Sequence, residues 1–161
     1  MTLQRLLRPA PRTSIVRTVA RVVLGGFLFF AGVGHLTFAR DAFQAQVPTW
    51  LPVDADFVVL ASGVVEIALG LALLVLGRWR VPVGWIVALF FVAVFPGNIS
   101  QFTTGTDSFG LNTDLTRGIR LLFQPLLVIW ALGATGASQA WRQSRAERRD
   151  PADQATESAR R

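Results

Sequence analysis

Apolar residues along the chain gather in four blocks, and nearly all basic residues fall outside these blocks or at their edges. We place the predicted membrane spans at 18–36, at 57–76, from Val81 onward, and at 117–134. Each is close to the roughly 20 residues that a helix needs to cross the hydrocarbon core of a bilayer. The third has fifteen uninterrupted apolar residues before a Pro-Gly pair at Pro96, so residues 96–99 must complete the crossing. That pair predicts a break or bend in the third helix.

This pattern predicts an all-α fold, namely an integral membrane four-helix bundle. The bundle should occupy residues 15–136, preceded by a basic cytoplasmic arm at 1–14. Residues 137–161 mix arginine with acids and small polar residues and carry no apolar face, which predicts a largely disordered cytoplasmic tail. The composition agrees, because 52% of the 161 residues are apolar and the mean hydropathy is +0.45.

The arginines predict the orientation in the membrane. Four arginines precede the first span, two lie between the second and third, and six follow the fourth. The other two loops hold Arg40, at most Arg117, and five aspartates. Basic loops stay on the cytoplasmic side, so both termini should be cytoplasmic in a multi-pass protein of the bacterial inner membrane. The net charge of +6 therefore indicates the lipid bilayer as the partner and not nucleic acid.

Two residue counts exclude whole classes of chemistry. The chain has no cysteine, which excludes disulfides, thiolate catalysis, iron–sulfur ligation and cysteine-based zinc sites. His35 is the single histidine, so bis-histidine haem ligation within one copy is excluded as well. We expect no metal site and no covalently bound cofactor.

One carboxylate lies in the middle of the second span. Glu66 is about nine residues from the outer end, roughly 13 Å deep, where an unpaired charge costs about 2.5–3.5 kcal/mol or more. Ser62 and Gly70 lie one turn to either side on the same face, and this stripe should face a neighbouring helix. Such a carboxylate must be paired, protonated or hydrated.

Four further polar residues lie at the outer ends of the spans: His35, Asn98, Arg120 and Gln124. Side chains lean toward the N-terminus of their helix, so Glu66 leans outward and His35 leans inward. We expect Arg120 as the leading counter-ion of Glu66 and His35 as the second, with neutral hydrogen-bonding groups from the two amides. The prediction is a polar pocket that opens outward, is floored by Glu66, and is covered by the loop at 100–116.

Each of these residues also has a purely structural interpretation. Arg120 could extend to the outer headgroups, and His35 and Asn98 could be interfacial residues without a ligand. Gln124 could be a hydrogen-bonded strut between helices. Glu66 could form a buried structural pair with Arg120.

Five segments of the chain resemble a known family. They are RVVLGGFLFFAGVGHLTFA, VPTWLP, SGVVEIALGLALLV, ALFFVAVFPGNI and RLLFQPLLVIWAL. Together they resemble the DoxX family of small four-span membrane proteins over about residues 18–134. The polar positions that match the family pattern are His35, Glu66, Asn98, Arg120 and Gln124. The chain departs from the pattern at Leu36, where the family often has Phe, and at Leu122, where it often has Pro.

The resemblance implies a link to quinones, because DoxX members are similar to the small membrane subunit of thiosulfate:quinone oxidoreductase. Most of the family has no established activity. The first hypothesis is therefore a non-autonomous membrane subunit of a quinone-linked oxidoreductase, with quinone as a non-covalent cofactor and a redox partner subunit. Glu66 would accept and donate protons, and the substrate-binding residues would be His35, Ser62, Asn98, Arg120 and Gln124.

Two other functions fit the same residues. A proton-coupled small-molecule carrier also needs a buried acid beneath polar groups, and with only four spans it should act as a homodimer. A structural membrane protein would use the polar residues only for packing, and its Arg-rich tail would recruit a cytoplasmic partner or anionic lipid.

Overall fold

The computed structural model describes residues 13–110 and 113–145. Its elements are α2 (Ile15–Leu36), α3 (Arg40–Gln44), α4 (Ala55–Val75), the 3-10 turn η1 (Gly77–Trp79), α5 (Arg80–Thr104) and α6 (Asp114–Thr135). A further helical stretch follows α6 at 137–145. Every regular element of the described ranges is helical.

Four of these helices are long and apolar enough to cross a membrane: α2, α4, α5 together with η1, and α6. Large apolar side chains remain exposed on their outer faces, as expected for surfaces that contact lipid. Examples from the four helices are Val19, Phe30, Val64, Leu89, Leu122 and Ile129. The predicted all-α membrane four-helix bundle is confirmed, and the chain is a multi-pass membrane protein.

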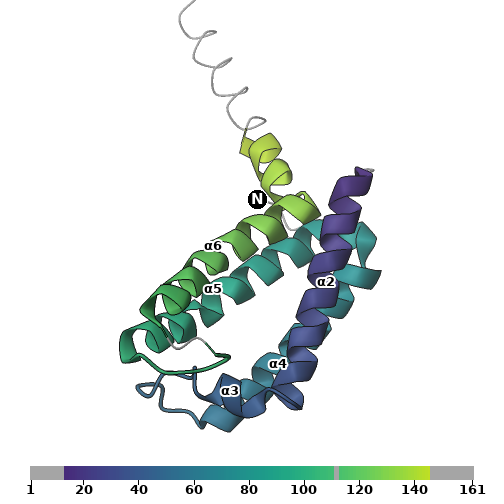
Figure 1. Cartoon of the computed structure of the whole chain (residues 1–161). Coiled ribbons are helices and arrows are strands. Elements are labelled where there is room, and N and C mark those ends of the chain that lie inside the picture. The colour runs from purple at the N-terminus through teal and green to yellow at the C-terminus, as the bar shows by residue number, and fades with distance from the viewer. Residues whose placement is uncertain (1–12, 111–112, 146–161) are drawn as a thin grey trace, which may run out of the picture.

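The bundle consists of two antiparallel helix pairs, α2 with α4 and α5 with α6 (Figure 1). The pairs meet where α2 begins and α6 ends, and they diverge toward the opposite end (Figure 1). At that opposite end, α3 and the loop that follows α5 lie between the two pairs (Figure 1). Contacts between polar residues of the two helix pairs at this end are therefore made through these two connecting segments.

Glycines bring α2 and α4 into backbone contact. A Cβ atom added at Gly32 would lie 2.6 Å from the carbonyl oxygen of Gly63, and one added at Gly70 would lie 2.7 Å from that of Gly25. The two glycines of each helix are seven residues apart and thus share one face. Small residues at such spacing let membrane helices pack closely, so these four positions fix the register of the pair.

The apolar core lies in the half of the bundle where the two pairs meet. Its buried members come from all four spans: Leu24, Leu28, Leu73, Val83, Val87, Ala88, Phe91 and Ala131. In the same half, Gly84 of α5 leaves room for the fully buried side chain of Thr135 on α6. The polar residues lie mainly in the other half, where the two pairs diverge.

Of the predicted break or bend in the third span, the break is wrong, because α5 runs as one helix from Arg80 to Thr104 through Pro96. Proline removes one backbone donor, and in membrane helices neighbouring side chains can satisfy the freed carbonyl groups. The carbonyl group that Pro96 frees is that of Val92, four residues earlier, and Gln124 of α6 donates to the neighbouring carbonyl oxygen of Phe91. As a consequence, the connecting loop begins at Gly105 instead of residue 100.

Both predicted limits of the bundle, residues 15 and 136, lie within the described residues and can be compared with the helix ends. The side chain of Ser14 accepts a hydrogen bond from the backbone N–H of Arg17, which starts α2 at Ile15. Ala137 is fully buried, and the helix at 137–145 extends order beyond position 136. The predictions for most of the arm (1–12) and for the end of the tail (146–161) lie outside the described residues.

Candidate functional site

Glu66 and His35 face each other across α4 and α2. Both are buried, with 9% and 7% of their surface exposed, and 3.1 Å separates Glu66 Oε2 from His35 Nδ1. A Cβ atom added at Gly63 would lie 2.7 Å from the Cβ of His35. The glycine therefore makes room for the imidazole and brings it to the carboxyl one turn along α4.

One oxygen atom of the Glu66 carboxyl group lacks a hydrogen-bond donor. His35 Nδ1 lies 2.9 Å from the carbonyl oxygen of Ala31, and its N–H can serve only one of the two acceptors. Glu66 Oε2 is buried and has no hydrogen-bond partner among the described residues. Buried oxygen atoms are almost always paired, so this one marks a place where a donor is missing.

A second polar group joins α5 to α6. Arg120 Nε donates to Asn98 Oδ1 over 3.1 Å, and Asn98 Nδ2 donates to Gln124 Oε1 over 2.9 Å. The buried Gln124 continues the series by donating to the carbonyl oxygen of Phe91. The series connects both helices at the depth where they diverge from α2 and α4.

Two loop residues complete this group, and the sequence did not identify either. Arg120 Nη2 donates to Gln46 Oε1 over 2.7 Å, and Gln46 Nε2 lies 3.3 Å from Ser108 Oγ. Ser108 Oγ in turn donates to the carbonyl oxygen of Ala42 in α3. Both residues are polar and buried. They lie in connecting segments that have no hydrophobic periodicity, so the only sequence signal for them is that apolar residues stand next to them.

An aromatic column links the two polar groups. The ring of Phe43 stacks on His35 at 3.4 Å between centroids, and Phe109 meets Phe43 edge-on at 4.7 Å. The guanidinium carbon of Arg120 lies 5.4 Å from the centroid of Phe109, at cation–π distance. The pair of His35 and Glu66 is thus connected to the group of Asn98, Arg120 and Gln124 through α3 and the loop after α5.

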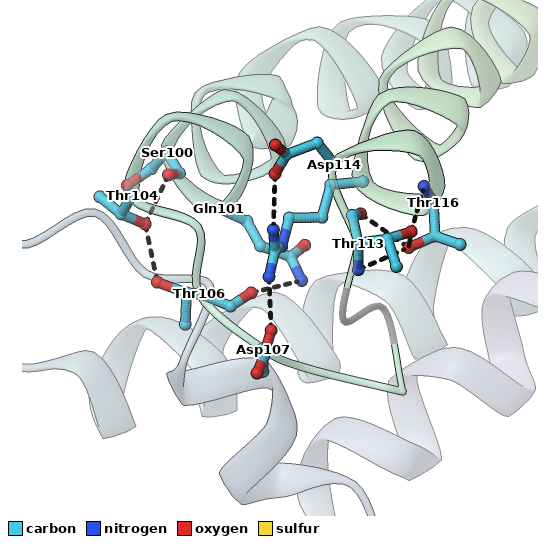
Figure 2. A network of polar contacts seen from close by, with 9 residues as sticks. Ser100, Gln101, Thr104, Thr106, Asp107, Thr113, Asp114 and Thr116 are labelled. Carbon is cyan, nitrogen blue, oxygen red and sulfur yellow. Dashed lines mark hydrogen bonds and ion pairs between the residues drawn. The ribbon is translucent and has the colours of Figure 1, made fainter.

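An ion-pair network holds that loop in place (Figure 2). Buried Arg117 donates to Asp107 and, over 2.9 Å, to Asp114. The side chain of Gln101 donates to the backbone of Thr106, and a capping box of Thr113 and Thr116 starts α6. These bonds position the segment that carries Ser108 and Phe109.

The small helix α3 is tied to α4 in a similar way. Arg40 pairs with Asp56 through two bonds, and the side chain of Gln44 donates to the same carboxylate. The hydrogen bond with Asp56 raises the pKa of Arg40 above its ordinary value and thus favours its charged form. Phe43 is thereby held against His35.

Two expectations about the site are corrected. Arg120 forms no ion pair with Glu66; its guanidinium bonds to Asn98 and Gln46, because the helix pairs diverge here and these acceptors are closer. His35, expected as the second partner, is the residue beside the carboxyl. The stripe that faces α2 consists of Gly63, Glu66 and Gly70, whereas Ser62 is half-buried and forms no hydrogen bond within the described chain.

A family model described as a domain of unknown function, DUF8561, matches residues 24–135, and the chain belongs to this family. No curated protein matches, and no solved structure matches either. The matched region contains both polar groups and the aromatic column. No group of three or more His, Cys, Asp or Glu side chains that could hold a metal ion occurs in the residues described above.

Proposed function

We propose that this protein is a DoxX-type membrane subunit of a quinone-linked oxidoreductase system and that Glu66 exchanges a proton with a quinone head group. The observation that carries the proposal is the buried Oε2 atom of Glu66, which lacks a donor and lies beside His35. A quinol hydroxyl group is a donor of the kind that this atom lacks. The apolar tail of a quinone also suits a site reached from the bilayer.

The proton and the electrons would follow separate routes. Oxidation of a quinol to a quinone releases two protons and two electrons. Glu66 takes one proton from the hydroxyl that donates to it, and the imidazole of His35, 3.1 Å away, balances or relays that charge. The second proton leaves to the outer aqueous phase. A redox partner subunit accepts both electrons, because the sequence has no cysteine and only one histidine to hold a redox group. Quinone reduction reverses each step.

The neighbouring residues supply the other contacts that a quinone head group needs. The rings of Phe43 and Phe109 offer faces for stacking. Guanidinium and amide N–H groups suit the carbonyl oxygens of the ring, and hydroxyl groups suit its hydroxyl form. The proposed substrate-binding residues remain His35, Ser62, Asn98, Arg120 and Gln124.

We further propose that the protein lies in the bacterial inner membrane with both termini in the cytoplasm and the site near the outer surface. The arginines of the described chain support this orientation. Arg17 and Arg21 near the start of α2 share one end of the bundle with Arg78 and Arg80, whereas the opposite end carries five aspartates. Basic residues mark the cytoplasmic side.

The test is quinol binding by the Glu66→Gln variant in proteoliposomes. Binding of decylubiquinol, the reduced form that carries the donating hydroxyl group, is followed by quenching of tryptophan fluorescence. Loss of a hydrogen bond to a charged group should weaken binding roughly tenfold or more. The control is Asp41→Asn, which removes an exposed carboxylate from the same end of the molecule and should change binding less than about twofold. Wild-type protein that does not bind the quinol, or a Glu66→Gln variant that binds it unchanged, would refute the proposal.

A structural role is the second candidate, and the series from Arg120 to Gln124 favours it. Its amide and guanidinium groups already bond to one another and to Phe91, as the struts of a packed interface do. If Glu66 and His35 also serve only packing, their joint replacement by glutamines should be tolerated better than either single replacement. A double-mutant cycle on the unfolding free energy tests this structural role. The redox role instead predicts that both single variants and the double variant lose quinol binding.

A further inference from the structure

Arg120 carries a positive charge that no carboxylate of the described chain neutralises. It lies six residues after Asp114, the first residue of α6, and thus about 9 Å along the helix axis from that end. The side chain is half-buried, and a guanidinium group stays protonated in proteins. Arg120 takes part in none of the ion pairs of the described residues.

The aspartates at this end of the bundle are engaged elsewhere or exposed. Asp107 and Asp114 both bond to Arg117. The remaining three cap α4, pair with the arginine of α3, or stay exposed on α3. Residues 80–106 and 115–135, which include the rest of α5 and α6, contain no Asp or Glu. One unit of positive charge is therefore left without a counter-charge beside the polar site.

Neutral partners hold the guanidinium group of Arg120 in place. Its Nε donates to Asn98 Oδ1 over 3.1 Å, and its Nη2 donates to Gln46 Oε1 over 2.7 Å. Both acceptors are amide oxygens, which orient the group without cancelling its charge. Nη1 forms no hydrogen bond to the described residues and is not enclosed by them. A guanidinium has five N–H donors, so this one keeps donors for a ligand.

An aromatic ring adjoins the unneutralised charge. The centroid of the Phe109 ring lies 5.4 Å from the guanidinium carbon of Arg120, and the side chain is 44% exposed. The backbone of Phe109 has a φ of 55°, a conformation that residues with a bulky side chain rarely adopt. Such strain persists only where the surrounding structure enforces it, and it is common at binding sites. The loop thus holds an accessible apolar ring next to a free cation.

We propose that Arg120 and Phe109 form a binding site for an aromatic monocarboxylate from the aqueous phase at this end of the bundle. The carboxylate would accept from the guanidinium group, and its single charge balances that of Arg120. The ring of the ligand would pack against Phe109. A phosphate group suits the site less well, because it brings nearly two charges and three acceptor oxygens to one side of one guanidinium. The site does not rest on the proposed quinone reaction, since it needs neither Glu66 nor a redox partner.

The test compares a charged ligand with a neutral ligand of the same shape. Fluorobenzoate and fluorobenzamide are titrated into the full chain in dodecyl maltoside micelles, and binding is followed by fluorine NMR against micelles alone. Hydrogen bonds to charged groups are strong, so wild type should prefer fluorobenzoate by about tenfold or more. Arg120→Gln should reduce this preference to less than about twofold. Wild type that does not bind fluorobenzoate, or binds both ligands equally, would overturn the proposal.

Two variants separate the loss of this charge from other causes. Arg120→Lys keeps the charge but not the planar fork, and it should retain a preference of about threefold or more. A lysine variant that loses the preference as fully as the glutamine variant would overturn the proposal, because charge would not determine binding. Arg78→Gln removes an exposed arginine at the opposite end and should change the preference less than about twofold. Equal losses in Arg78→Gln and Arg120→Gln would overturn the site in favour of diffuse attraction to a basic protein.

The aromatic part of the proposal has its own measurement. Phe109→Leu keeps Arg120 and should weaken fluorobenzoate binding by about two- to tenfold, the contribution of an aromatic pair. Acetate has the carboxylate without the ring, and inorganic phosphate has neither the ring nor the single charge. Both should compete with fluorobenzoate at least about tenfold less effectively than benzoate does. Competition on equal terms by either anion would indicate a general anion site and overturn the assignment of an aromatic carboxylate.

Discussion

The close contact between α2 and α4 makes Gly32 the most informative position for a stability test. Gly32→Ala adds a single methyl group to the face of α2 that packs against α4. That Cβ would lie 2.6 Å from the carbonyl oxygen of Gly63 and 2.8 and 2.9 Å from Cγ1 and the backbone nitrogen of Ile67. Two of these three neighbours are backbone atoms, which cannot move by changing a rotamer. The methyl group can be accommodated only if the two helices separate.

The size of the effect follows from these distances. Ordinary van der Waals contact requires roughly 0.8 Å more space than the Gly63 oxygen leaves, and overpacking of this kind costs about 1–3 kcal/mol. Alanine is favoured over glycine in a helix by about 1 kcal/mol, which offsets part of the cost. We expect Gly32→Ala to lower the free energy of unfolding by up to about 2 kcal/mol, and by about 1–3 kcal/mol relative to an alanine placed in the same helix without overpacking. The separation would also lengthen the 3.1 Å distance between His35 and Glu66.

The assay is reversible unfolding by SDS titration in mixed micelles, followed by far-UV circular dichroism. Gly26→Ala is the control, because nothing lies within 4 Å of its added Cβ and it occurs in the same helix. That control should raise stability by about 0.5–1 kcal/mol through helix propensity alone. If the two variants were equally stable, α2 and α4 would not be in backbone contact, and the placement of His35 against Glu66 would lose its basis.

Two other predictions concern the end of the bundle where the helix pairs diverge. Arg117→Gln removes both ion pairs that hold the loop after α5, so amide hydrogen exchange at residues 105–110 should accelerate by about tenfold, whereas Arg78→Gln should leave it unchanged. Unaltered exchange would show that the loop is held by other contacts. Gln124→Leu removes the acceptor of Asn98 Nδ2 and the side-chain donor to the carbonyl oxygen of Phe91, and it should cost about 1–3 kcal/mol in the same SDS titration. The exposed Gln143→Leu should cost less than about 0.5 kcal/mol, and similar losses for both would show that the bonds of Gln124 do not stabilise the bundle.

Some features could be predicted because they depend only on local properties of the chain. Hydropathy and the helical rise per residue suffice to place the four spans, and the ends of α2 and α4 lie within three residues of those expected. The polar residues inside the spans were also evident, since each is conspicuous in an apolar block. The position of each polar residue along its helix also follows directly from its residue number and the helical rise.

Which polar side chains contact one another does not depend on local properties of the chain, and the prediction made from the sequence for Glu66 was wrong. It indicated Arg120 for Glu66 because a guanidinium is the stronger counter-ion at a similar depth, but depth does not say which helices adjoin. The glycines of α2 and α4 bring those two helices together, which places His35 at the carboxyl and leaves Arg120 to Asn98. A proline likewise predicts a break only if no neighbour satisfies the freed backbone.

The sequence by itself determined that this chain has four membrane-spanning helices and carries polar groups within them, because the transfer free energy of each segment depends on its own composition. Only the tertiary structure decided which polar groups meet. Gln46, Phe43, Ser108 and Phe109 belong to segments without a periodic pattern, and they reach the site because Arg40 and Arg117 hold those segments between the diverging helix pairs. Such contacts depend on the distance between helices and on the path of the loops, which hydropathy does not record.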